Sequence, residues 1–186
     1  MDCYTSAYPF VLTSDTTSGD LGGLEGAHTF CQNYVDQYSS LPEGDYKAWL
    51  CDSTECVNLA PNRDYEYHYP SDSQVGTTFN TDSQGRGPGD NLAWNTEDTF
   101  GDDPQESTGG GPATGRDSGD SSDRWSLNPY TGETQCNDWT TNDNNNALTR
   151  GDFNDGTTDD NRWHQRTDLI CGWNTVQIIC FLDQPD

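Results

Sequence analysis

Basic residues are scarce in this chain of 186 residues: it has one lysine and seven arginines, against 25 aspartates and seven glutamates. The formal net charge of −24 at pH 7 opposes the attraction to phosphates on which nucleic-acid binding depends, so nucleic acid is excluded as a partner. Long apolar runs are also missing, and none approaches the roughly 18 residues that a membrane-spanning helix needs. The opening Met-Asp-Cys-Tyr is not a signal peptide, and we expect a mature exported domain.

Histidine is equally sparse, and the three residues His28, His68 and His164 are far apart in the sequence. No His-Glu-x-x-His motif and no Gly-x-Ser-x-Gly motif occurs. Adjacent carboxylates are inevitable among 32 acidic residues, so they carry no information about glycosidase chemistry. We interpret His28 as a surface or flanking residue of a helix, and we predict that the protein is not an enzyme.

Cysteine, by contrast, is abundant, with seven residues in a chain that is only 30% hydrophobic. Disulfides compensate for a modest core in oxidising compartments, so we expect an extracellular or cell-surface protein. The placement of Cys31 near the start, and of Cys171 and Cys180 near the finish, suggests a disulfide that joins the first helix to the last strand. The length and the aromatic content favour one small core and therefore a single domain over residues 1–186.

Regular structure is predicted mainly near the two ends of the chain. A short apolar run predicts a strand over 8–14, and residues 46–51 and 176–182 have the same character. Between the first two strands, apolar residues recur every three or four positions from Leu24 to Tyr38, which predicts an amphipathic helix with Cys31 on its buried side.

A long polar region separates these ends. From about 70 to 135 the regular patterns fade, and Ala113 is the only aliphatic residue between Gly101 and Arg124. The segment from Gly101 to Arg124 cannot contribute to a core. Long structureless loops in compact domains are usually functional or disordered, and the sequence leaves both alternatives open.

Two groups of motifs resemble a known family. The first is Gly19-Asp20-Leu21-Gly22-Gly23-Leu24-Glu25-Gly26-Ala27, followed by Cys31 and Tyr46-Lys47-Ala48-Trp49-Leu50; the second is Cys136-Asn137-Asp138-Trp139-Thr140, Trp163, Cys171 and Ile179-Cys180-Phe181. In this order they resemble a bacterial surface-domain family with a C-type-lectin-like fold, which includes the endostatin-like leptospiral surface proteins. The resemblance implies an α+β fold with disulfide-clamped termini and a long irregular acidic loop region.

The resemblance also implies the disulfide pairing. Cys31 is expected to bridge to Cys180 across the termini, and Cys136 to Cys171 beneath the long-loop region. Cys51 and Cys56 then remain as a local third pair. Cys3 is left over, available for a bond to another segment or another subunit.

The excess of aspartate has two readings. It is either a solvated surface or a set of loops that bind a hard cation such as calcium through oxygen ligands. The candidate ligands are Asp102, Asp103, Asp117, Asp120 and Asp123, together with the stretches 142–146 and 152–160. No strict Asp-x-Asp-x-Asp-Gly spacing selects among them.

The tripeptides that calcium-dependent lectins of this fold use for sugars are missing from their expected places. The long loop has Asn128-Pro129-Tyr130, and Trp163 is followed by His164 and Gln165. Gln184-Pro185-Asp186 has the galactose-type spelling but follows the last cysteine, so we interpret it as coincidence.

Six tryptophans divide into two groups. Trp49, Trp139 and Trp173 are near core cysteines or strands and are predicted to pack in the core. Trp94, Trp125 and Trp163 flank polar loops and are candidate ligand contacts, with core packing as the alternative.

Together these features predict a secreted or cell-surface adhesion module that binds a host protein, a matrix component or a glycan, with calcium as a candidate cofactor. The alternative is a structural subunit of an extracellular filament or surface layer that self-assembles through cation-binding loops.

Overall fold

A five-stranded mixed sheet forms the centre of the fold. The structure is a computed structural model, and it describes residues 7–13, 17–69, 74–85, 129, 135–150, 166–172 and 177–185. The strands of this sheet are β1 (Tyr8–Leu12), β2 (Gly44–Ala48), β3 (Asp64–Tyr69), β4 (Gln74–Asn80) and β7 (Ile179–Pro185). The other elements are the helix α1 (Gly23–Val35), the short α3 (Gln135–Trp139), and β5 (Ala147–Arg150) with β6 (Arg166–Ile170) in a second sheet. The fold is therefore mixed α+β.

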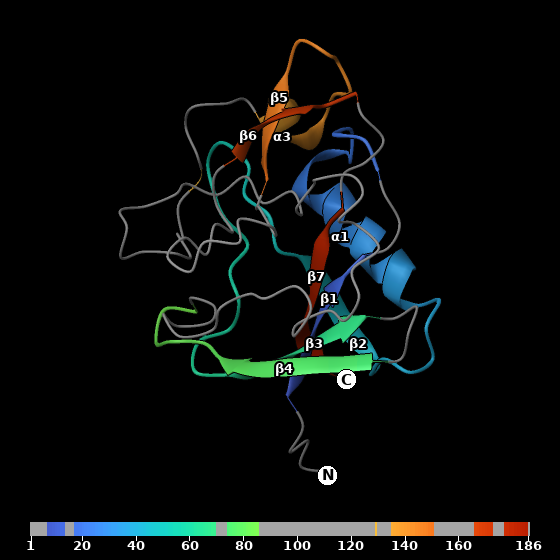
Figure 1. Cartoon of the computed structure of the whole chain (residues 1–186), viewed down its shortest axis with the longest axis vertical. Helices are drawn as coiled ribbons and strands as arrows, with labels where there is room; N and C mark the ends of the chain where they lie inside the picture. Colours follow the sequence, from blue (N-terminus) through green and yellow to red (C-terminus); the bar gives the residue numbers. More distant parts are fainter. Residues whose placement is uncertain are drawn as a thin grey trace.

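The strand order is β2-β7-β1-β3-β4, and only β1 and β3 run parallel. The first and last strands are antiparallel neighbours, with Phe10 opposite Phe181 and Leu12 opposite Ile179. The start of β1 and the end of β7 consequently lie at the same end of the sheet (Figure 1). The β5–β6 pair and α3 lie at the opposite end.

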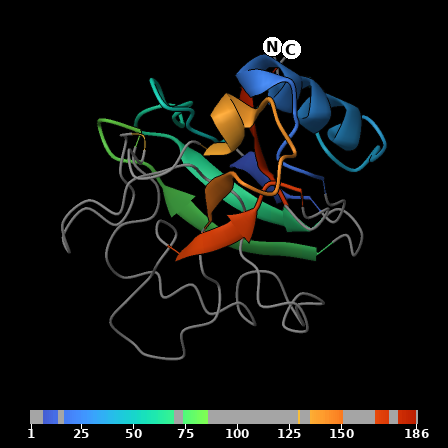
Figure 2. The ribbon, with the colours of Figure 1, turned by 90° about the horizontal axis from the view of Figure 1, so that it is seen from above.

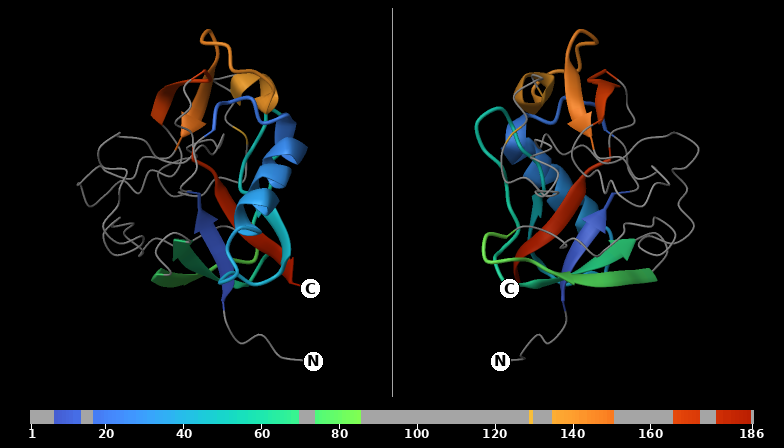
Figure 3. Two further views of the ribbon diagram at one scale, coloured as in Figure 1. Left: turned by 90° about the vertical axis from the view of Figure 1, so that its right-hand side faces the viewer. Right: turned by 60° about the vertical axis from the view of Figure 1, so that its left-hand side comes forward.

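The helix α1 begins after two glycines in left-handed conformation, Gly22 with φ 82° and Gly23 with φ 80°. Residues with a Cβ rarely adopt these angles, so the Gly-Gly pair of the sequence motif fixes where the helix starts. The predicted spacing is confirmed, because Ala27, Cys31 and Tyr34 are buried on one side of the helix. Figure 3 shows α1 alongside β7, on one face of the sheet.

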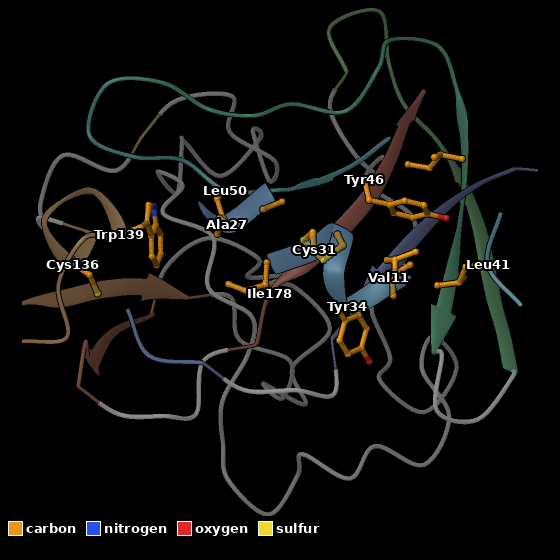
Figure 4. Packing of buried hydrophobic residues seen from close by; sticks show 14 of the residues in the cluster. Val11, Ala27, Cys31, Tyr34, Leu41, Tyr46, Leu50, Cys136, Trp139 and Ile178 are labelled. Atoms are coloured by element: carbon orange, nitrogen blue, oxygen red, sulfur yellow. A yellow bond between two sulfur atoms is a disulfide. The ribbon is translucent and has the colours of Figure 1, made fainter. Parts of the chain in front are cut away.

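Alternate residues of the strands face two separate cores. Val11, Cys180 and Leu182 face α1, where Tyr46, Leu50 and Trp139 complete the cluster (Figure 4). The opposite face of the sheet is aromatic: the ring of Phe10 lies 5.3 Å from those of Tyr67 and Phe79 and 5.8 Å from that of Trp49. Trp49 and Trp139 are thus core residues, as predicted, whereas Trp173 lies outside the described residues.

Three disulfides connect these elements, and they are the pairs that the resemblance implies. Cys31 on α1 bonds to Cys180 on β7, Cys136 on α3 bonds to Cys171, and Cys51 bonds to Cys56. Cys3 lies outside the described residues.

The strand predictions are only partly right. β2 covers Gly44–Ala48 rather than 46–51. Trp49 and Leu50 are buried, as expected for a core segment, but they follow the last residue of the strand. β4 lies inside the region from 70 to 135 that was expected to lack regular structure. Its sequence, Gln-Val-Gly-Thr-Thr-Phe-Asn, contains four strand-favouring residues, Val75, Thr77, Thr78 and Phe79, which were a usable local signal, and the strand pairs with β3.

Candidate functional site

The predicted ligand-binding residues belong to segments outside the described residues. This holds for the candidate cation ligands Asp102, Asp103, Asp117, Asp120 and Asp123, and for Trp94, Trp125 and Trp163. What the structure defines is where these segments join the framework. Residues 86–128 follow the turn after β4, and residues 151–165 are inserted between β5 and β6.

One end of the framework is especially rich in cross-links, and we call it the disulfide pole: residues 51–56, 135–146 and 171–172. The chain enters this pole at Gln135, after the long acidic region, and leaves it through β5 towards the second acidic segment. Seen from above, α3 lies beside the start of α1 (Figure 2). The backbone amides of Leu21 and Gly22 both donate to the carbonyl of Trp139, at 2.8 and 2.9 Å.

The short α3 is a left-handed turn in which all five residues have φ between 46° and 62°. For residues with a Cβ this conformation costs about 1–2 kcal/mol each, so the surrounding contacts must hold it in place. The Cys136–Cys171 bond is one such contact, and the indole Nε1 of Trp139 donates to the buried carbonyl of Cys51 at 2.9 Å. The sequence offers no signal for this turn beyond Asn137-Asp138, two residues that tolerate left-handed angles.

Gly19 of the N-terminal motif packs closely against the Cys136–Cys171 disulfide of this pole. A Cβ at Gly19 would lie 2.2 Å from the Sγ of Cys136, so no other residue fits between this segment and the disulfide. The motif Gly19 to Ala27 is therefore explained by the packing of the chain against Cys136–Cys171 and by the start of α1.

The loop between Cys51 and Cys56 is organised by one carboxylate. Oδ1 of Asp52 accepts the amides of Thr54 and Glu55, at 2.7 and 2.8 Å, and the hydroxyl of Thr54. Burial alone would raise the pKa of Asp52, but these hydrogen bonds outweigh burial and lower it. The amide of Ser53 donates to Asp138 at 2.8 Å, which connects this loop to α3.

The stretch 142–146, a candidate for cation binding, is described in full and forms a tight turn. Oδ1 of Asp143 accepts the backbone amide and the side-chain amide of Asn145, at 3.0 and 2.7 Å. Within the described residues, no group of three or more His, Cys, Asp or Glu side chains is arranged to hold a metal ion. Asp143 therefore closes a turn here, and the remaining predicted ligands, including 152–160, lie outside the described residues.

Two histidines are described, and both make structural contacts. Nδ1 of His28 accepts the amide of Ala48, and the residue is half-buried, which corresponds to the flanking position among the two predicted alternatives. Nε2 of His68 lies 3.3 Å from Oε2 of Glu66, two residues away on β3. Burial lowers the pKa of His68, with Glu66 acting in the opposite direction. The alternation in Tyr65-Glu66-Tyr67-His68-Tyr69 was a usable signal for both the strand and this pair.

Gln184 and Pro185, the first two residues of the galactose-type tripeptide, are part of β7 and lie opposite Asp45 and Gly44 of β2. They lie in the sheet ladder at the end of the molecule away from the disulfide pole. Asp186 is outside the described residues.

No protein-family model matches the chain. No curated protein matches its sequence either. None of the helices in the described part of the chain is both long enough and apolar enough to cross a membrane.

Proposed function

We propose that this protein is an extracellular or cell-surface binding module with a C-type-lectin-like scaffold, in which the acidic segments recognise a host protein, a matrix component or a glycan. The observation that carries the proposal is a covalently closed framework interrupted by acid-rich insertions. All three disulfides, and both sheets in the described part of the chain, are formed by residues outside 86–128 and 151–165. Sequence variation in the insertions need not disturb the framework, which is the usual logic of a binding scaffold.

The lectin-like assignment is supported by the connections between elements. The Cys31–Cys180 bond joins the first helix to the last strand, and the Cys136–Cys171 bond joins α3 to the residue that follows β6. The start of β1 and the end of β7 lie together at the end opposite the disulfide pole. A module tethered at that end would present the disulfide pole to a partner.

Replacing residues 101–124 with a short Gly-Ser linker tests the proposed recognition. Binding to an immobilised extracellular-matrix extract and to a glycan array should be lost. Disulfide mapping, and thermal melting in excess chelator, should stay unchanged, because this segment has Ala113 as its only aliphatic residue. A control variant with changes at two exposed framework residues, Asn33→Ala on α1 and Gln37→Ala just after it, should bind like the parent protein. Binding that survives the replacement would place recognition elsewhere.

Calcium binding by the acidic segments is part of the proposal. The test compares thermal melting of the protein in excess chelator with thermal melting in millimolar calcium, at the same ionic strength. A cation at 100 times its Kd stabilises the native state by about 2.7 kcal/mol. The test variant changes five candidate ligands to asparagine: Asp102, Asp103, Asp117, Asp120 and Asp123. The matched control removes the same charge from exposed framework acids: Asp20, Glu25, Asp36, Glu43 and Glu55. Stabilisation lost in both variants would indicate a general charge effect, and calcium-driven self-association would favour a structural assembly role.

A further inference from the structure

The outer edge of β2 is covered by side chains of α1. β2 is the last strand of the sheet and pairs only with β7 among the described residues. Just after β2, the amide of Trp49 donates to Ile179 of β7 at 2.8 Å, whereas the amides of Tyr46 and Ala48 point the other way. An edge strand with free amides is a template for pairing with another chain, so these two groups need acceptors.

Two residues one turn apart on α1 provide them. Oε1 of Gln32 accepts the Tyr46 amide at 3.0 Å, and Nδ1 of His28 accepts the Ala48 amide at 3.2 Å. Because the amide is the donor, Nδ1 must carry a lone pair, and the neutral ring must hold its proton on Nε2. Protonation of Nδ1 would place two donors against each other. Gln32 has no such dependence on pH.

Charged groups face His28 from three elements. Burial is the largest influence and lowers the pKa of His28. Glu25 on α1, Asp45 on β2 and Asp183 on β7 act in the opposite direction, and Lys47 on β2 acts with burial. Lys47 is held at 2.5 Å from Asp183, so these two charges largely offset each other near the ring.

A covalent bond limits any movement at this contact. Cys31, about one turn further along α1 than His28, is bonded to Cys180, and Cys180 lies opposite Ala48 in the sheet. Loss of the hydrogen bond from Ala48 to His28 therefore cannot release the helix as a whole. Any opening is local and reversible.

We propose that His28 is a proton-sensitive latch between α1 and the edge strand β2. The neutral ring closes the edge at Ala48, and the protonated ring opens it, while the Gln32–Tyr46 contact stays closed. Acidification thus exposes the backbone donor of Ala48 at the edge of β2.

Amide hydrogen exchange tests the latch with an internal control in the same strand. Protection factors of Ala48 and Tyr46 are measured by NMR from pH 4.5 to 7.5 and corrected for the intrinsic exchange rate, while the ¹⁵N shifts of His28 report its titration and tautomer. Ala48 should lose about fivefold in protection across that titration, the effect of one net hydrogen bond, and Tyr46 should stay constant. In His28→Asn, whose Oδ1 replaces Nδ1 as a non-titrating acceptor, protection at Ala48 should not depend on pH.

Two results would overturn the latch. One is a neutral His28 with its proton on Nδ1. The other is protection at Ala48 that stays constant while the ring titrates, or that falls equally at Tyr46, which would indicate general loosening of the helix.

Discussion

Removing the three disulfides one at a time should destabilise the protein in the order of the chain length that each closes. The bridges span 149 residues for Cys31–Cys180, 35 for Cys136–Cys171 and five for Cys51–Cys56. The chain-entropy relation then gives losses of about 5, 4 and 2 kcal/mol at 25 °C.

Packing does not reverse this order. All four cysteines of the two longer bridges are fully buried, so their replacement by alanine removes similar contacts. Cys56 in the shortest bridge is partly exposed, so its loss removes less. The difference of about 1 kcal/mol between the two longer bridges therefore reports mainly on loop length.

The assay is urea unfolding of three double-alanine variants under non-reducing conditions. Each variant carries Cys3→Ser, which removes the remaining thiol and prevents disulfide exchange. Equal m-values would show that the native and unfolded states expose comparable surface in all three. If loss of Cys51–Cys56 destabilises as much as loss of Cys31–Cys180, the reasoning from loop closure is wrong, and the local contacts of the 51–56 loop matter more.

Three further outcomes are expected. Replacing Trp139 by benzothienylalanine, which keeps the ring size without the N–H, should cost about 1–3 kcal/mol in urea unfolding because the buried carbonyl of Cys51 loses its donor. Trp139→Phe should cost more, because the smaller ring also leaves a cavity in the core, and an unchanged unfolding free energy of the benzothienylalanine variant would contradict this reasoning. Asn62, exposed with φ 51°, should accept glycine without loss of thermal stability but lose about 1–2 kcal/mol on replacement by valine; equal melting of the two variants would contradict the left-handed geometry. Because the folded-state pKa of His68 is lowered from 6.5, its contribution to stability is present above pH 6.5 and is lost as the pH falls through the lowered value. His68→Gln should accordingly flatten the rise of the unfolding free energy between pH 5 and 7, and an unchanged slope would exclude this linkage.

The sequence by itself determined the elements whose signals are local. The spacing from Leu24 to Tyr38 predicted α1, and the apolar runs predicted β1 and β7, because burial of one helix side or one short strand leaves a periodic pattern. The cysteines were paired by a resemblance, since spacing alone does not decide connectivity. The aspartate excess indicated candidate cation ligands, but it selected no constellation among them.

Tertiary structure decided what depends on distant partners. The left-handed turn of α3 persists because Cys171 and Cys51 hold it from other parts of the chain. The local sequence around His28 indicates only a surface or flanking residue of a helix, and its hydrogen bond with the Ala48 amide depends on β2 lying beside α1. In each case the deciding energy comes from a contact between residues far apart in the sequence, and no local pattern encodes such a contact.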